Sequence, residues 1–252
     1  MMIWRLARGE RTGEYRPRPV FQRLVWVPES SSQCVAFSPD GKYLAGSGEN
    51  GMTIWRLSPG ERTGDDRPRP TFEPMVRVPV PMSVGFAFSP DGKLVAFVHD
   101  FRGVHLWDLE HGREVPLRGP ELLSGYGNLS FRPPGRELAF VTARGVGEVW
   151  DTAAGTRVLS LGGDGAFAGP TSSISPGGHW FAGESTPAGV VLWDLRRREL
   201  AFSLREERSP VWSHAWSPDE RRLAIGLSDG GLSIWDLQEV QSRLNELGLG
   251  WR

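Results

Sequence analysis

Residues 35–57, VAFSPDGKYLAGSGENGMTIWRL, contain the two phrases that decide the fold. The first phrase is Phe-Ser-Pro-Asp-Gly between two hydrophobic runs. Pro presets one turn dihedral angle, Asp bonds the nearby backbone and Gly accepts a positive φ, so this phrase predicts a tight turn. The second phrase is a tryptophan that ends a later hydrophobic run. The stretch therefore predicts three short strands, which are Val35-Ala36-Phe37, Tyr43-Leu44-Ala45 and Thr53-Ile54-Trp55.

Both phrases recur along the chain. Trp-Asp-Leu or a close variant begins at Trp4, Trp55, Trp107, Trp150, Trp193 and Trp235, and the intervals between these tryptophans are 51, 52, 43, 43 and 42 residues. Phe-Ser-Pro-Asp-Gly stands at 37–41 and 88–92, with degraded copies at 131–135, 174–178 and 216–220. A period in the forties predicts a stack of one repeated unit.

A weaker fourth run follows in most repeats, such as Val158-Leu159-Ser160-Leu161. Four short strands per repeat, joined by turns, are typical of a propeller blade. On these motifs the chain resembles the WD40-repeat family over nearly all of residues 1–237, and its tail resembles that of bacterial members. The resemblance implies an all-β fold: a WD40-type β-propeller with five full blades, an N-terminal partial blade and a short C-terminal α-helix.

The motifs divide the chain into a propeller over 1–237 and a tail over 238–252. We expect a partial repeat at 1–28 and full repeats at about 30–79, 80–118, 124–161, 168–205 and 209–237. In the tail, Leu237, Val240, Leu244 and Leu247 recur at helical spacing before Gly248, which predicts an amphipathic helix. Its apolar face docks on the propeller or, alternatively, on a partner.

The last repeat has no fourth strand of its own. The N-terminus supplies a third strand at Met2–Leu6 and a fourth at Val20–Val27. The resemblance implies that Val20–Val27 completes the last blade by pairing near Ser233–Leu237. The alternative is that this chain is the C-terminal part of a longer, open propeller. An open edge could also pair with a second copy, so we expect a monomer or an edge-paired dimer.

The resemblance also implies that the repeated tryptophans and aspartates are structural. These residues are Trp55, Trp107, Asp108, Trp150, Asp151, Trp193, Asp194, Trp235 and Asp236, with Asp229 in the turn before the last third strand. The Gly-His pair that the family places before each first strand is absent from every repeat. The buried Asp-His-Ser-Trp network of many WD40 blades therefore cannot form, which predicts a less stable or more divergent propeller.

A recent duplication carries the candidate partner-binding residues. Residues 4–28 and 55–79 align without a gap and are identical at 16 of 25 positions. Both copies contain GERTG-x-x-RPRP, which the later repeats lack. The arginines of these inserts could grip an acidic or phosphorylated partner, although neighbouring acidic residues favour a solvated linker. They are Arg11, Arg16, Arg18, Arg62, Arg67 and Arg69.

The sequence offers little that predicts catalysis. None of the histidines, His99, His105, His111, His179 and His214, has the spacing of a metal site, and Cys34 is the single cysteine. His214 aligns with Val35, Phe86 and Leu129 on a first strand, where we expect a core histidine. Gly162-Gly163-Asp164-Gly165 predicts a turn rather than a phosphate loop. We expect no enzyme activity, no cofactor and no metal.

Composition narrows the function classes further. The formal net charge of -1 excludes the basic excess of a typical nucleic-acid binder, and no apolar run is long enough to span a membrane. The lone Cys34 suits a reducing compartment, so we expect a soluble, cytoplasmic protein without nucleic-acid or membrane partners. The resemblance implies a non-catalytic scaffold for protein–protein interaction, with Trp26, Trp180 and Trp212 as candidate anchors. Two alternatives stay open: a C-terminal segment of a longer propeller fused to a signalling domain such as a kinase, and a propeller enzyme with a metal in its channel.

Overall fold

The computed structural model describes most of the 252-residue chain. The described residues are 2–8, 19–26, 32–48, 51–58, 70–78, 85–99, 103–117, 128–163, 165–169, 171–185, 189–205 and 209–248. They belong to two compact units, Met1–Met82 and Ser83–Arg252, and each unit is described by itself.

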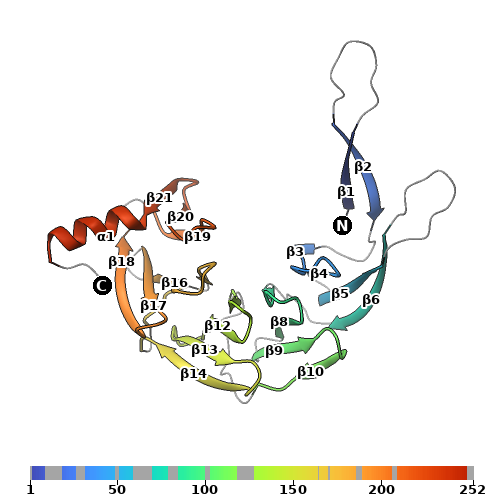
Figure 1. Cartoon of the computed structure of the whole chain (residues 1–252), viewed down its shortest axis with the longest axis horizontal. Helices are drawn as coiled ribbons and strands as arrows, with labels where there is room; N and C mark the ends of the chain where they lie inside the picture. Colours follow the sequence, from blue (N-terminus) through green and yellow to red (C-terminus); the bar gives the residue numbers. More distant parts are fainter. Residues whose placement is uncertain are drawn as a thin grey trace, which may run out of the picture. The chain divides into compact units, whose positions relative to one another are not determined.

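The first unit contains a two-stranded hairpin and a four-stranded sheet (Figure 1). The hairpin pairs β1 (Met2–Arg8) with β2 (Pro19–Trp26). The sheet follows the chain through four antiparallel strands, which are β3 (Ser32–Phe37), β4 (Tyr43–Gly48), β5 (Gly51–Ser58) and β6 (Thr71–Val78).

The β1–β2 hairpin has the same strand pairing and the same register as β5 and β6 of the sheet. Trp4 lies opposite Arg23 in the hairpin, and Trp55 lies opposite Pro74 in the sheet. Both ladders shift register at the bond before the tryptophan, which is the mark of a β-bulge. The duplicated sequence therefore folds twice into the same third and fourth strands.

The second unit contains four sheets in chain order. Their strands are β7 (Phe86–Phe88), β8 (Leu94–His99), β9 (Gly103–Asp108) and β10 (Arg113–Val115); β11 (Ser130–Arg132), β12 (Glu137–Val141), β13 (Gly147–Asp151) and β14 (Thr156–Leu161); β15 (Ser172–Ile174), β16 (Trp180–Ser185), β17 (Gly189–Asp194) and β18 (Glu199–Arg205); and β19 (Val211–Trp216), β20 (Arg222–Leu227) and β21 (Leu232–Asp236). Strands adjacent along the chain are antiparallel neighbours, so each sheet is a meander (Figure 1).

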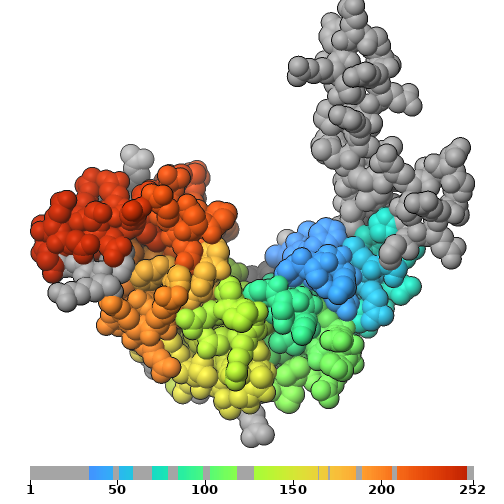
Figure 2. Space-filling view, in the orientation of Figure 1, coloured from blue at the N-terminus to red at the C-terminus, as the bar shows by residue number. Residues whose placement is uncertain are grey.

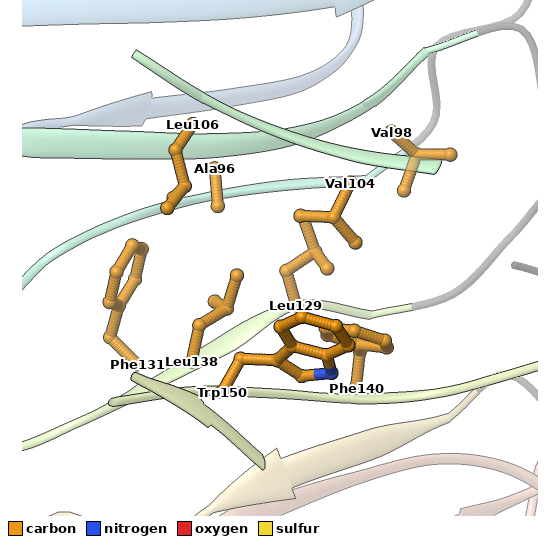
Figure 3. Packing of buried hydrophobic residues seen from close by; sticks show 9 residues of the cluster. All are labelled: Ala96, Val98, Val104, Leu106, Leu129, Phe131, Leu138, Phe140 and Trp150. Carbon is orange, nitrogen blue, oxygen red and sulfur yellow. The ribbon is translucent and has the colours of Figure 1, made fainter. Parts of the chain in front are cut away.

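Neighbouring sheets of the second unit pack through buried side chains. In Figure 3, Ala96 and Leu106 of one sheet face Phe131, Leu138 and Trp150 of the next. All nine residues of this cluster are buried. Two further clusters join the later sheets in the same way, and the space-filling view shows the green-to-red segments in contact (Figure 2). Since burying one large apolar side chain is worth roughly 1.5–3 kcal/mol, these contacts hold the stack together.

Phe167 fills the seam between two of these sheets. It follows the glycine-rich residues 162–165 and is 3% exposed. A Cβ atom at Gly183 would lie 2.4 Å from the Phe167 ring, and one at Gly147 would lie 2.9 Å from it. Both glycines are therefore required by the close approach of the ring. The Phe167 N–H donates to the Gly145 carbonyl at 2.9 Å, which fixes the loop above the seam.

The helix α1 (Leu237–Glu246) begins directly after β21. The Asp236 carboxylate caps its first turn by accepting the N–H groups of Gln238 and Glu239. Leu237 is buried against the last two sheets, whereas Leu247 is 71% exposed, so the docked part of the helix is its first turn. Among the described residues, none of the helices has the length and apolar character needed to cross a membrane.

The last sheet leaves one face uncovered. Leu232 and Ile234 in β21 are 68% and 63% exposed. Val190 and Leu192 hold the same positions in β17, where the last sheet covers them completely. In this unit, each earlier sheet buries one face against the next sheet. The corresponding face of β19–β21 is therefore exposed.

The fold class expected from the sequence is confirmed, with antiparallel sheets and one short helix. The last sheet has three strands, as its sequence predicts, and β2 is hydrogen-bonded to β1. The pairing of Val20–Val27 with the region near Ser233–Leu237 stays a prediction.

Candidate interaction surface

The turns between first and second strands and those between third and fourth strands lie at the same end of each sheet, because antiparallel strands alternate in direction. We call this end of the second unit the turn face. It carries the two phrases that recur in the sequence, together with the residues that differ from repeat to repeat.

The serine and aspartate of the first turns bind their own backbone. In the second unit, the Ser217 hydroxyl donates to Asp219 Oδ1 at 2.5 Å, and the Arg221 N–H donates to the same oxygen at 3.1 Å. These hydrogen bonds, with the one from Ser217 the strongest, lower the pKa of Asp219. The same arrangement recurs at Ser38 and Ser89. Each of these aspartates holds its own turn through a single carboxylate oxygen, Oδ1.

The aspartate that follows each tryptophan closes the turn after the third strand. Asp151 Oδ1 accepts the N–H groups of Ala153 and Ala154, each at 2.9 Å, and Arg136 Nε donates to Oδ2 at 2.9 Å. The Ala154 N–H, opposed by burial and helped by Arg136, lowers the pKa of Asp151. Asp108, Asp194 and Asp236 accept pairs of backbone N–H groups in the same way. Asp229 accepts the Gly231 N–H at 2.8 Å in a turn at the opposite end of its sheet.

The repeated tryptophans are packed to different depths. Trp55 and Trp150 are buried, at 6% and 4% exposure, while Trp107, Trp193 and Trp235 are half-buried. Trp150 Nε1 donates to Glu148 at 2.8 Å, and Glu148 binds Arg157 at 2.7 Å. This buried carboxylate holds the tryptophan of its sheet without the family's Asp-His-Ser-Trp network.

One turn receives its carboxylate from the next repeat. Ser175-Pro176-Gly177-Gly178 has glycine where three other turns have aspartate. Glu220, from the turn of the following sheet, accepts the Gly177 N–H at 2.5 Å and binds His179 Nδ1 at 2.7 Å. Burial raises the pKa of Glu220, but hydrogen bonds from Ser175, Gly177 and His179 outweigh it and hold the pKa below its ordinary value. The two turns are locked together.

Two pockets open on the turn face. The first, which we call the arginine pocket, has a volume of about 370 Å³ and lies between the turns of sheets β11–β14 and β15–β18. Its charged lining residues are Arg132, Arg136, Arg196 and Glu137. The second, which we call the carboxylate pocket, has a volume of about 550 Å³ and lies between the turns of sheets β7–β10 and β11–β14. Its charged lining residues are Asp91, Asp108, Glu110, Lys93 and Arg136.

His214 lies between two first strands, as its alignment predicts. Its Nε2 lies 2.8 Å from Ser173 Oγ, which also accepts Trp216 Nε1–H at 3.0 Å. The indole can only donate, so Ser173 Oγ accepts from Trp216, and the same hydroxyl lies within hydrogen-bond distance of His214. Nδ1 has no hydrogen-bond partner among the described groups, and burial lowers the pKa of His214 to about 4. Among the described residues no carboxylate is hydrogen-bonded to this ring, and the His214–Ser173 pair links two sheets.

The other described histidine side chains pair separately. His105 binds Glu114, His111 binds Asp108 at 2.8 Å, and the side chain of His99 is not among those described. Within the part of the chain that the structure describes, His, Cys, Asp and Glu side chains form no group able to hold a metal ion.

The residues predicted to bind a partner differ in whether the structure describes them and in how exposed they are. Arg11, Arg16, Arg18, Arg62, Arg67 and Arg69 lie outside the described residues, as does the side chain of Trp26. Trp180 is half-buried and packs edge to face on Phe202, with ring centroids 6.2 Å apart. Trp212 is 76% exposed, which suits an anchor.

Sequence reasoning missed the arginine pocket. Residues 196–198 form an exposed turn between β17 and β18. The signal that could have found the pocket is the unusual run of three arginines beside two degraded Pro-Asp-Gly turns.

Comparison with known proteins gives the family. The profile described as "WD domain, G-beta repeat" matches residues 28–56 and 198–236. A guanine nucleotide-binding protein subunit beta of Oryza sativa subsp. japonica is 23% identical over 229 residues, which are 85% of this chain and 55% of that protein. The WD repeat-containing protein 26 homolog of Drosophila melanogaster is 22% identical over 214 residues, or 81% of this chain and 31% of that protein.

A third relative, the B-type cell cycle switch protein ccs52A of Medicago truncatula, is 30% identical over 112 residues, or 42% of this chain and 22% of that protein. The chain thus spans between 22% and 55% of the length of these three relatives. The profile matches fall on the repeated strands and turns described above. Residues 28–56 and 198–236 of the chain are therefore WD40 repeats.

Proposed function

We propose that the chain is a non-catalytic scaffold that binds a protein partner. One observation carries this proposal: the polar residues that recur in the repeats are used in their own turns, whereas residues that differ between repeats are exposed. Asp151 and Asp219 illustrate the first group, and Arg196 and Trp212 the second. A frame of this kind positions variable side chains for recognition without supplying reactive groups.

The relatives support a role in an assembly. The rice protein is by name a subunit of a guanine nucleotide-binding protein, and this chain covers 55% of its length. WD40 proteins generally bind other proteins, and Trp212 and Arg196 are of the types that dominate interface energies.

We place the protein in the cytoplasm of a bacterial cell. A single cysteine, Cys34, is the usage expected in a reducing compartment, and the tail after the last repeat resembles that of bacterial members. We expect a monomer or an edge-paired dimer in the absence of its partner, which size-exclusion chromatography with light scattering will distinguish.

The proposal is tested by cross-linked capture on the purified chain, followed by reconstitution with the purified candidate. We expect a stoichiometric complex with a defined heat of binding, weakened by Trp212→Ala. Trp180→Ala is the matched control, because Trp180 packs within its own sheet. The proposal is wrong if capture gives nothing above a blank support, or if the purified chain turns over a substrate with saturation kinetics.

A further inference from the structure

The arginine pocket and the carboxylate pocket adjoin. Pro134 and Arg136, both from the turn between β11 and β12, line the two pockets together. One turn therefore separates two hollows of about 370 and 550 Å³. A single extended ligand laid across this turn contacts both, whereas a small ligand fills one.

The arginine pocket carries uncompensated positive charge. It is lined by three guanidinium groups and by one carboxylate, Glu137, which Arg132 already binds at 2.8 Å. Arg136 is shared with Asp151 at 2.9 Å. Arg196 has no carboxylate partner among the described residues, and its guanidinium contacts His179 Nε2.

The lock between the two turns explains why Arg196 stays unpaired. Glu220 contacts His179 Nδ1, and a guanidinium can only donate, so a hydrogen bond from Arg196 requires the lone pair of His179 Nε2. This contact leaves the charge of Arg196 uncancelled, because an imidazole carries no negative charge. A guanidinium held in this way suits an incoming carboxylate.

The carboxylate pocket has the opposite character. Three carboxylates line it against Lys93 and Arg136, and one of the three, Asp108, already contacts His111 Nδ1 at 2.8 Å. Its walls include Leu94 and Val115, which can pack against the aliphatic stem of a lysine or arginine. Glu110 is exposed, and its side chain makes no ion pair within the described part of the chain.

These opposite charges favour a peptide over a nucleic acid. A nucleic-acid strand that enters the arginine pocket and continues across Pro134 would bring its phosphates against Asp91, Asp108 and Glu110. A peptide can instead present an acidic side chain to one pocket and a basic side chain to the other.

We propose that the two pockets together bind an extended peptide segment of the partner, with an acidic side chain in the arginine pocket and a basic side chain in the carboxylate pocket. The inference rests on the proposed scaffold function and names the surface and the chemistry of the partner. It places recognition on the turn face, over the turn between β11 and β12.

The test uses fluorescein-labelled peptides with two Glu at one end, two Lys at the other and Gly-Ser spacers of graded length, in both chain directions. We expect one of these peptides to bind with saturation below about 1 mM, and its affinity to fall between about 50 and 300 mM NaCl. Arg196→Glu and Glu110→Lys should each weaken binding about tenfold or more.

Charge reversal makes the test specific. A peptide with Glu in place of its two Lys should regain affinity for Glu110→Lys and bind the wild type poorly. Arg198→Gln is the matched control, because Arg198 is exposed on the same turn as Arg196 and lines neither pocket. Circular dichroism and thermal unfolding confirm that each variant is folded, and Arg196→Lys, which keeps the charge, should retain most of the binding.

Three results would overturn the inference: no saturable binding by any peptide, equal weakening by Arg196→Gln and Arg198→Gln, or equal binding of an all-acidic peptide. The scaffold function is judged separately with the captured partner. If the partner binds the wild type and Arg196→Glu equally, the scaffold function stands and the peptide site is wrong.

Discussion

At the scale of single residues, four of the first turns hold a carboxylate, and it comes either from the turn itself or from the next repeat. Asp40, Asp91 and Asp219 supply it from within their own turns. In the turn that has Gly177 instead, Glu220 supplies it from the neighbouring sheet. A Cβ atom at Gly177 would lie 2.7 Å from the Glu220 carboxylate, so an aspartate at this position requires the Glu220 side chain to move.

A double-mutant cycle tests this exchange. Gly177→Asp and Glu220→Gly should each lower the free energy of unfolding by about 1–3 kcal/mol, the first through a clash and the second through lost hydrogen bonds. Together they create Ser-Pro-Asp-Gly in both turns and place glycine, which adopts a positive φ without strain, at the position where Glu220 has a φ of 58°. The double variant should therefore lose about 1 kcal/mol less than the sum of the single variants in urea unfolding. Additive losses would show that the two turns are independent.

His214 gives the blade stack a pH dependence. Its pKa is about 4 in the folded chain and 6.5 in its ordinary state, so the native chain binds fewer protons than the unfolded chain between these values. Stability from this group is complete above pH 6.5 and falls as the pH drops toward 4. Between pH 7.5 and 5, the wild type should lose about 2 kcal/mol more than His214→Leu in urea unfolding. Equal losses of unfolding free energy in both proteins would contradict the lowered pKa of His214.

The sequence predicts such residues only where the signal is local. Pro-Asp-Gly indicates its turn because all three side chains act within it, and His214 could be placed on a first strand by alignment alone. Glu220 could not be found in this way, since its partners Gly177 and His179 are 43 and 41 residues away. Their contact depends on how two sheets pack.

At the scale of elements, one capping geometry starts two kinds of structure. Asp194 accepts two backbone N–H groups, and the chain then returns as β18. Asp236 accepts two N–H groups at the same offsets, and the chain continues as α1. The cap is common to both, so the residues after it decide the outcome. After Asp236, Gln238 and Glu239 lie within a stretch whose apolar residues recur at helical spacing, and this spacing predicts α1.

Removing the cap separates the two cases. Asp236→Ala and Asp194→Ala should each cost about 1 kcal/mol, because each leaves two N–H groups without their carboxylate. Only Asp236→Ala should also reduce the helical circular dichroism signal at 222 nm. A full helical signal in Asp236→Ala would mean that packing of Leu237 alone maintains α1.

The loop before β15 shows the limit of local prediction at this scale. Its glycines indicate a turn, and a turn is present. The insertion of Phe167 between Gly147 and Gly183 carries no comparable signal, because neither glycine lies in a turn motif and both stand in strands. The need for glycine at these two positions becomes visible only when Phe167 is packed between the neighbouring sheets.

At the scale of the molecule, stability depends on which sheet faces are covered. Leu192 is buried under the last sheet, and Ile234 occupies the same position on that sheet with 63% exposure. The repeat pattern predicts both residues as core, since it reports position within a repeat and not the presence of a neighbour.

This difference predicts unequal costs for equivalent substitutions. Leu192→Ala should destabilise the chain by about 2–5 kcal/mol through lost burial and a cavity, whereas Ile234→Ala should cost less than about 0.5 kcal/mol. Both values come from urea unfolding of the same purified protein at several concentrations. A large, concentration-dependent cost for Ile234→Ala would show that another copy covers this face in solution.

The exchanged carboxylate also limits how the repeats can be rearranged. Repeats of one period look like interchangeable parts that recombination can delete, copy or reorder. Here the turn with Gly177 depends on the repeat that carries Glu220, so a rearrangement has to keep these two repeats adjacent. A deletion or insertion of a repeat between β18 and β19 would separate Gly177 from Glu220. The turn with Gly177 would then lack a carboxylate, and Glu220 would lack its hydrogen-bond partners. This would happen even where every repeat of the rearranged gene matches the family pattern.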